Sequence, residues 1–124
     1  MWRVIESNSG VSYCLERLAF CKSYRVAEVC QELGCSQRYL HTMFVRDIGF
    51  PPKQWMMMER MVVARRKLEG GRTPEEVAND LGFLSIQTFR RQFYRFFQVV
   101  PERFVKSRRI FDPAKMEVPD GNRN

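Results

Sequence analysis

Residues 77–104 read VANDLGFLSIQTFRRQFYRFFQVVPERF, and residues 29–52 read VCQELGCSQRYLHTMFVRDIGFPP. A Val-x3-Leu-Gly motif at residues 29–34 recurs 48 positions later, at residues 77–82. An apolar-x3-Phe pair and a proline then follow each motif at an offset of 49, residues 40–44 matching 89–93 and Pro52 matching Pro101. Each copy predicts a short apolar helix, a glycine turn and a longer helix, so the chain contains a duplicated helix-turn-helix.

Capping residues support the boundaries of these helices. Residues 73–76 read Thr-Pro-Glu-Glu, which places a hydroxyl at the N-cap, proline at the first helical position and Glu at N3. This is a full capping box. Ser36 and Ser85 follow their turn glycines and can accept a hydrogen bond from an unpaired N–H of the helix that each opens.

A long helix is predicted between the two copies, from Pro52 to about Leu68, ended by Gly70-Gly71. Its apolar spacing of three to four residues puts on one face Trp55, Met58, Val62 and either Met61 or Arg65. A further helix is expected before the first copy, from Val11 to about Lys22 with Ser12 as its cap, and a last one from Pro101 to about Arg109. We expect no strand, because residues 3–5 and 99–100 are too short to count.

The predicted fold class is all-α, with about seven helices and two helix-turn-helix units joined by a long linker helix. We divide the chain into an N-terminal arm or linker remnant (residues 1–11), a first unit (12–50), the linker helix (51–71), a second unit with the last helix (72–109) and a flexible tail (110–124). The 124 residues allow one compact domain or two very small ones, which excludes a large multi-domain enzyme.

The charge balance is basic: 21 Lys and Arg against 14 Asp and Glu give a net charge of +7, and Arg outnumbers Lys by 16 to 5. Arginine fits a phosphate or a guanine edge with two donors at once, so this surplus favours nucleic acid, although charge alone fits an anionic membrane surface equally well. Residues 84–109 hold seven basic side chains and one acidic, nearly the whole surplus. No apolar stretch or leader suggests secretion or a membrane span, and we expect a cytoplasmic protein.

Metal, redox or catalytic chemistry finds little support. The four cysteines, Cys14, Cys21, Cys30 and Cys35, include no C-x-x-C pair, and we interpret them as small buried hydrophobes rather than as a metal or redox centre. His41 is the single histidine and has no identifiable nucleophile or carboxylate pair beside it. We therefore expect no enzyme, no cofactor and no metal.

Helical periodicity sorts the side chains of the two longer helices. In the first, Leu40, Met43 and Phe44 share one side, and polar residues suited to base edges fall near or opposite them: Gln37, Arg38, His41 and Thr42. In the second, Phe89, Phe93 and either Phe96 or Phe97 face inward and leave outward Gln87, Arg90, Arg91 and Tyr94. One such helix is equally well explained as a solvated face, but the second copy favours a shared function. The phenylalanines could form a base-stacking platform, yet their helical spacing favours core packing.

The duplicated pattern resembles the DNA-binding domain of AraC/XylS-type bacterial transcription regulators over about residues 12–109. The resemblance rests on the Leu-Gly-Cys-Ser-x2-Tyr-Leu-x3-Phe run from Leu33, on Arg60-x3-Ala64-x3-Leu68, and on the Val-Ala-x3-Gly-Phe-x5-Phe-x3-Phe run from Val77 to Phe93. The chain departs from the family at Gln98, where glycine is usual, and at Val100, where Ser or Thr precedes the proline.

This resemblance implies a seven-helix domain whose two recognition helices enter successive major-groove segments on one face of the duplex. Base-facing positions are assigned to Gln37, Arg38, His41, Thr42, Ile86, Gln87, Arg90 and Arg91. Phosphate contacts are assigned to Ser36, Arg46, Ser85, Tyr94 and Arg95. Family members commonly carry a separate sensing or dimerisation domain, so we expect either an excised domain or a short stand-alone member.

We therefore expect sequence-specific binding of double-stranded DNA in bacterial transcription regulation, with RNA polymerase as an additional partner. Two alternatives remain open. An RNA or single-strand binder would need exposed aromatics. A basic helical module could instead bind a membrane surface or another protein.

Overall fold

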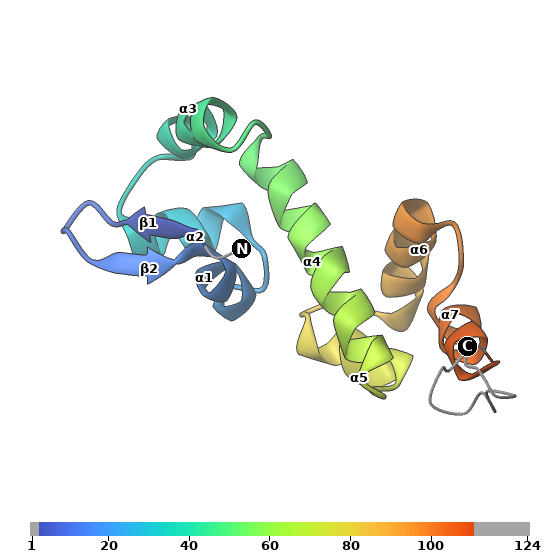
Figure 1. The fold of residues 1–124 in the computed structure, drawn as a ribbon. Coiled ribbons are helices and arrows are strands. Elements are labelled where there is room, and N and C mark those ends of the chain that lie inside the picture. Colours follow the sequence, from blue (N-terminus) through green and yellow to red (C-terminus); the bar gives the residue numbers. More distant parts are fainter. Residues whose placement is uncertain (1–2, 111–124) are drawn as a thin grey trace, which may run out of the picture.

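The computed structural model describes residues 3–110 and contains, within them, seven helices and one two-stranded sheet (Figure 1). The strands are β1 (Val4–Glu6) and β2 (Ser12–Cys14). The helices are α1 (Leu15–Cys21), α2 (Val26–Leu33), α3 (Gln37–Asp47), α4 (Pro52–Glu69), α5 (Pro74–Asp80), α6 (Ile86–Phe97) and α7 (Pro101–Ile110). The predicted helical class and the duplicated unit are confirmed, whereas the tail prediction falls on residues outside the described part, apart from Ile110 at the end of α7.

The N-terminal segment corrects two predictions. Residues 4–6 pair antiparallel with residues 12–14, with Ile5 opposite Tyr13, so the expectation of no strand was wrong. The helix predicted from Val11 begins only at Leu15, and Ser12 lies in β2 instead of capping it. The turn is closed by two bonds between Ser7 and Val11, one to the Ser7 hydroxyl at 3.0 Å and one to the Val11 carbonyl at 2.7 Å.

The hairpin formed by β1 and β2 packs onto the first helix-turn-helix unit. Ile5 is buried, and the N–H of Asn8 donates to the carbonyl of Leu33 at the end of α2, at 2.7 Å. On the other side, Glu16 of α1 accepts a hydrogen bond from the N–H of Arg3 at 2.9 Å. Residues 3–14 therefore extend the first unit, and pairing with it explains why so short a strand is stable.

The caps predicted for the two helix-turn-helix units are confirmed at Ser36, Thr73 and Ser85. The hydroxyls of Ser36 and Ser85 accept bonds from the N–H groups of Tyr39 and Thr88, and Thr73 with Glu76 forms the full capping box. Gly34 ends α2 in the left-handed region, with φ of +70°, as a glycine turn requires.

The long helix α4 connects the two units as predicted and ends at Gly70. Its buried face differs from the expected stripe: Val62 is exposed, and the buried positions are Pro52, Trp55, Met56, Met61, Ala64 and Leu68. These positions do not form one stripe because α4 is packed by α1, α2 and α3 of one unit and by α5, α6 and α7 of the other. One continuous core results, and it includes Phe44 against Trp55 in the first unit and Phe89 with Phe93 in the second.

A left-handed residue ends α6 at Gln98, where φ is +61°. A side chain at such a position costs about 1–2 kcal/mol relative to glycine. We expect Gln98→Gly to raise the free energy of unfolding by about 0.5–1 kcal/mol, because glycine removes the strain of the left-handed backbone. Two effects offset part of this gain: glycine has greater freedom in the unfolded chain, and the 3.2 Å hydrogen bond from the Gln98 side-chain amide to the Arg95 carbonyl is lost.

Urea denaturation of both proteins measures this difference. The matched control is Gln92→Gly, which places glycine inside α6 and should lower stability by about 1 kcal/mol. Equal destabilisation by both substitutions would show that the conformation of residue 98 costs nothing.

Among residues 3–110, the structure has no helix with the length and apolar character that a bilayer crossing demands.

Candidate nucleic-acid interface

The outer face of α3 carries the four polar residues predicted there. Gln37, Arg38, His41 and Thr42 are all exposed, while Leu40 and Phe44 on the opposite side are fully buried. The Thr42 hydroxyl donates to the carbonyl of Arg38 at 3.1 Å, which fixes its side chain along the helix. α3 therefore presents a polar surface over its first two turns, followed by the exposed Val45, and its buried apolar face holds it in place.

The outer face of α6 is similar in position but different in detail. Of the four residues predicted to face outward, Gln87, Arg91 and Tyr94 are exposed, whereas Arg90 is half-buried. Arg95, predicted to contact phosphate, is also exposed. Ile86 is half-buried and packs against the core, so only part of its side chain can face a ligand. Of the two inward candidates, Phe97 packs on Phe93, with ring centroids 4.7 Å apart, whereas Phe96 is exposed.

Arg90 is held by an acidic residue that sequence reasoning did not assign to the site. Its guanidinium lies 2.7 Å and 2.8 Å from the Glu102 carboxylate of α7. This hydrogen bond raises the pKa of Arg90, so the side chain stays charged. Glu102 is the only acidic residue in 84–109, but nothing in the spacing shows that α7 folds back onto this arginine.

Ion pairing distinguishes the arginines of the two recognition helices from each other. Arg46, predicted to contact phosphate, pairs with its neighbour Asp47 at 2.8 Å and 3.0 Å. By contrast, Arg38, Arg91 and Arg95 make no ion pair with any residue in the described range 3–110. These three guanidiniums are the ones available to an external anion without first breaking an internal contact.

A shallow cleft of about 540 Å³ runs beside α6 and is lined by Arg90, Arg91, Tyr94, Arg95, Gln98 and Val100. Three of these six residues are arginines, so the cleft concentrates positive charge on one side of the helix. Ser36 and Ser85, also predicted to contact phosphate, use their hydroxyl oxygens as acceptors in the helix caps. Their O–H groups can still act as donors, although that of Ser85 lies 3.0 Å from the Thr88 hydroxyl.

Arg60 of α4 fixes the second unit to the linker helix. It donates two hydrogen bonds to the carbonyl of Leu81, at 2.8 Å and 3.1 Å, and its guanidinium lies 3.6 Å from the ring centroid of Phe83. Phe83 in turn packs against Phe89 of α6, with centroids 5.2 Å apart. The orientation of α6 is thus tied to α4 through two contacts in series, Arg60 on Phe83 and Phe83 on Phe89, and the bonds to Leu81 hold Arg60 in place.

α3 lies at the N-terminal end of α4, and α6 lies beside the C-terminal half of α4 (Figure 1). α4 has 18 residues, which corresponds to about 27 Å at 1.5 Å per residue. Two capped helices with polar outer faces are therefore carried by one rigid helix, and this geometry defines a tandem helix-turn-helix domain.

Comparison with known proteins agrees with this class. The sequence profile of a family described as "Helix-turn-helix domain" matches residues 29–107, more than half of the chain. The chain belongs to the AraC/XylS-type family of helix-turn-helix transcription regulators, as a DNA-binding domain of that family.

Two curated relatives are similar to the chain. It is 29% identical over 86 residues to an HTH-type transcriptional regulator of Mycobacterium tuberculosis, and the aligned region covers 68% of this chain and 33% of that regulator. It is 26% identical over 101 residues to the raffinose operon transcriptional regulatory protein of Pediococcus pentosaceus, covering 81% of this chain and 36% of that one. The chain thus spans about a third of the length of these relatives.

Solved structures share the fold. The DNA-binding domain of AdpA, a global transcriptional factor determined in complex with a target DNA, has a TM-score of 0.69 and 26% identity, covering 78% of this chain and 91% of that domain. The C-terminal domain of the response regulator YesN from Fusobacterium nucleatum has a TM-score of 0.64 and 24% identity, and the match covers 73% of this chain and 94% of that domain.

Proposed function

We propose that α3 and α6 bind successive major-groove segments on one face of double-stranded DNA, and that the chain acts in bacterial transcription regulation through this contact. The observation that carries the proposal is the placement of two capped recognition helices, with exposed Arg38 and Arg91, against the two halves of the single helix α4. A major groove about 12 Å wide admits one helix.

The side chains divide into two proposed roles. Base edges are contacted from α3 by Gln37, Arg38, His41 and Thr42, and from α6 by Ile86, Gln87, Arg90 and Arg91. Phosphates are contacted by Ser36, Arg46, Ser85, Tyr94 and Arg95. Arg90 and Arg46 must first exchange their carboxylate partners, Glu102 and Asp47, for DNA. They therefore contribute less affinity than Arg38, Arg91 and Arg95, which make no ion pair within residues 3–110.

The wider role of the protein is also proposed. The family and the names of the two relatives both point to transcription, which makes RNA polymerase a further partner and the bacterial cytoplasm the place of action. The role is one of binding, with no catalytic step. The division into units at residues 12–50, 51–71 and 72–109 is part of the same proposal.

Salt dependence tests the electrostatic component. If the exposed arginines neutralise phosphates, the logarithm of the association constant falls linearly with the logarithm of salt concentration, by about 0.9 for each phosphate contacted and by about 4–8 in total. Fluorescence anisotropy with a labelled duplex over a salt series gives the slope. A nearly flat dependence, or tighter binding to single strands or anionic vesicles than to duplex, would contradict the proposal.

Two substitutions on α6 separate base reading from phosphate binding. The selected site is the duplex sequence that this chain enriches from a random pool. Arg91→Ala should cost about 1–3 kcal/mol on the selected site and relax base preference at one or two positions. Arg95→Ala, one turn later on the same exposed face, is the matched control and should weaken all duplexes alike. The association constants of both variants are measured on the selected site and on a scrambled duplex. Equal losses on the two duplexes for Arg91→Ala would assign that residue to the backbone instead.

A further inference from the structure

The turn between α2 and α3 brings two cysteines together that the sequence keeps five positions apart. The N–H of Cys35 donates to the carbonyl of Cys30 at 3.1 Å, and the N–H of Gly34 is shared between the carbonyls of Cys30, at 2.8 Å, and Gln31, at 3.3 Å. This bond pattern, with Gly34 left-handed, is a Schellman helix end, in which the side chains of the two residues that Cys30 and Cys35 represent commonly touch. The spacing is not C-x-x-C, so a search for redox motifs overlooks the pair.

Backbone geometry places the pair within reach of a disulfide. With the Cys35 N–H bonded to the Cys30 carbonyl, ordinary bond lengths hold the two Cα atoms within about 7 Å of each other. Disulfides usually join Cα atoms 4.4–6.8 Å apart. The two thiols also interact: burial, the charge of the neighbouring Cys35 and its hydrogen bond raise the pKa of Cys30 to about 11.

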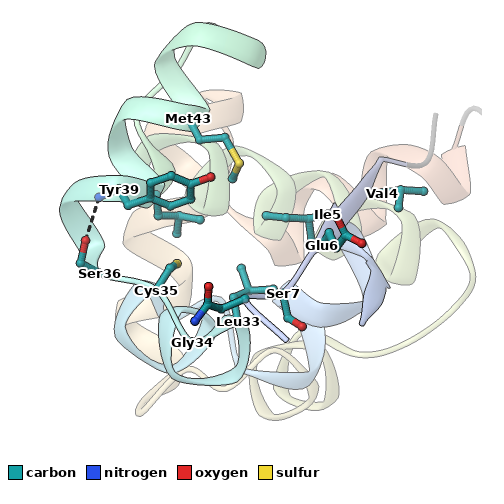
Figure 2. A pocket seen from close by; sticks show the side chains of 12 residues that line it. Val4, Ile5, Glu6, Ser7, Leu33, Gly34, Cys35, Ser36, Tyr39 and Met43 are labelled. Atoms are coloured by element: carbon teal, nitrogen blue, oxygen red, sulfur yellow. Dashed lines mark hydrogen bonds between the residues drawn. The ribbon is translucent and has the colours of Figure 1, made fainter. Parts of the chain in front are cut away.

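The two thiols differ in their access to solvent. Cys30 is 5% exposed, whereas Cys35 is half-buried and lines a cleft of about 590 Å³ between β1 and the start of α3. Figure 2 shows the Cys35 side chain beside Gly34, below Tyr39 and next to the Ser36 cap of α3. A reagent in this cleft therefore reaches Cys35, whereas the buried Cys30 does not line the cleft.

We propose that Cys30 and Cys35 form a reversible dithiol–disulfide site in the turn that leads into α3. The oxidant is a small disulfide of the glutathione class. The Cys35 thiol loses its proton and attacks one sulfur of the oxidised glutathione, whose S–S bond breaks and releases one glutathione thiol. The Cys30 thiol then loses its proton and attacks the Cys35 sulfur, which releases the second glutathione thiol.

In the overall reaction, two cysteine thiols are oxidised to one disulfide, and one glutathione disulfide is reduced to two glutathione thiols. Cys14 and Cys21 provide an internal comparison, because they stand at opposite ends of α1 and no backbone bond joins them. The chain therefore contains one pair of thiols held together by its fold and one pair that is not.

Trypsin cleavage of the unaltered chain separates the Cys30–Cys35 pair from Cys14 and Cys21. Cleavage after Arg25 and Arg38 puts Cys30 and Cys35 into one peptide, residues 26–38, while Cys14 falls into residues 4–17 and Cys21 into residues 18–22. The folded chain is treated with oxidised glutathione, its remaining thiols are alkylated, and the digest is analysed by mass spectrometry. We expect peptide 26–38 to become lighter by two hydrogen atoms and to resist alkylation, and dithiothreitol to reverse both changes.

Two variants test the order of attack, with far-ultraviolet circular dichroism confirming their folding. Cys30→Ala keeps the core apolar and should stop the reaction at one glutathione on Cys35. Cys35→Ser removes the accessible thiol and should leave Cys30 alkylatable only after unfolding. The proposal is overturned if wild-type peptide 26–38 retains two free thiols while Cys14 or Cys21 takes up glutathione, or if Cys35→Ser is glutathionylated at Cys30 as readily as wild type is oxidised.

Discussion

Replacing Phe93 by alanine is expected to lower the free energy of unfolding by about 3–5 kcal/mol. Phe93 is fully buried on α6 and contacts three other rings, those of Phe89, Phe97 and Phe104, at centroid distances of 5.7, 4.7 and 5.7 Å. Its removal leaves a cavity between α6 and α7 and loosens the face that holds the recognition helix in place.

The matched control is Phe96→Ala, three positions along the same helix. Phe96 is 37% exposed, so the same truncation should cost less than about 1 kcal/mol and leave duplex binding intact. Urea denaturation of the two variants gives both values. Equal costs would contradict the burial pattern, and a selective loss of nucleic-acid binding in Phe96→Ala would favour a stacking platform for single strands.

The repeat and the caps made most of the fold predictable. The Val-x3-Leu-Gly motif, the hydroxyl cap and the apolar-x3-Phe pair each predict a local structure of four to eleven residues. These motifs occur twice in the same order, which strongly indicates two copies of one unit. The hairpin was missed for the opposite reason, since strands of three residues carry less than two periods of alternation. Its stability comes from Ile5 and Asn8, which contact the first unit rather than each other.

Prediction failed where residues distant in the sequence decide the outcome. The buried face of α4 was placed on Val62 because a single stripe was assumed, whereas two units pack on this helix from different directions. The exposed residues of both recognition helices followed from periodicity alone. The pairing of Arg90 with Glu102 did not, because it depends on how the left-handed Gln98 turns α7 back onto α6.

The rigid connection between the units makes a prediction about DNA geometry. Because α4 is a continuous helix and Arg60 ties α6 to it, the two recognition helices cannot separate or rotate independently. Major-groove segments on one face of B-DNA recur every 34–36 Å, and a modest bend in the DNA can compensate for a shorter span of the protein. One chain is therefore expected to occupy an asymmetric site of about 17–20 base pairs, without a palindrome and without a second copy.

The most direct measurement compares the affinity of the chain for its selected site with and without base pairs inserted between the two half-contacts. Five added base pairs turn the second half-contact to the opposite face, and affinity should fall by about 10³-fold or more, to near the nonspecific level. Ten added base pairs restore the face but not the distance, and should also be rejected, whereas five added outside the site should have no effect. Full affinity after the five-base-pair insertion, or two chains bound to an inverted repeat in the ultracentrifuge, would contradict joint reading of DNA by α3 and α6.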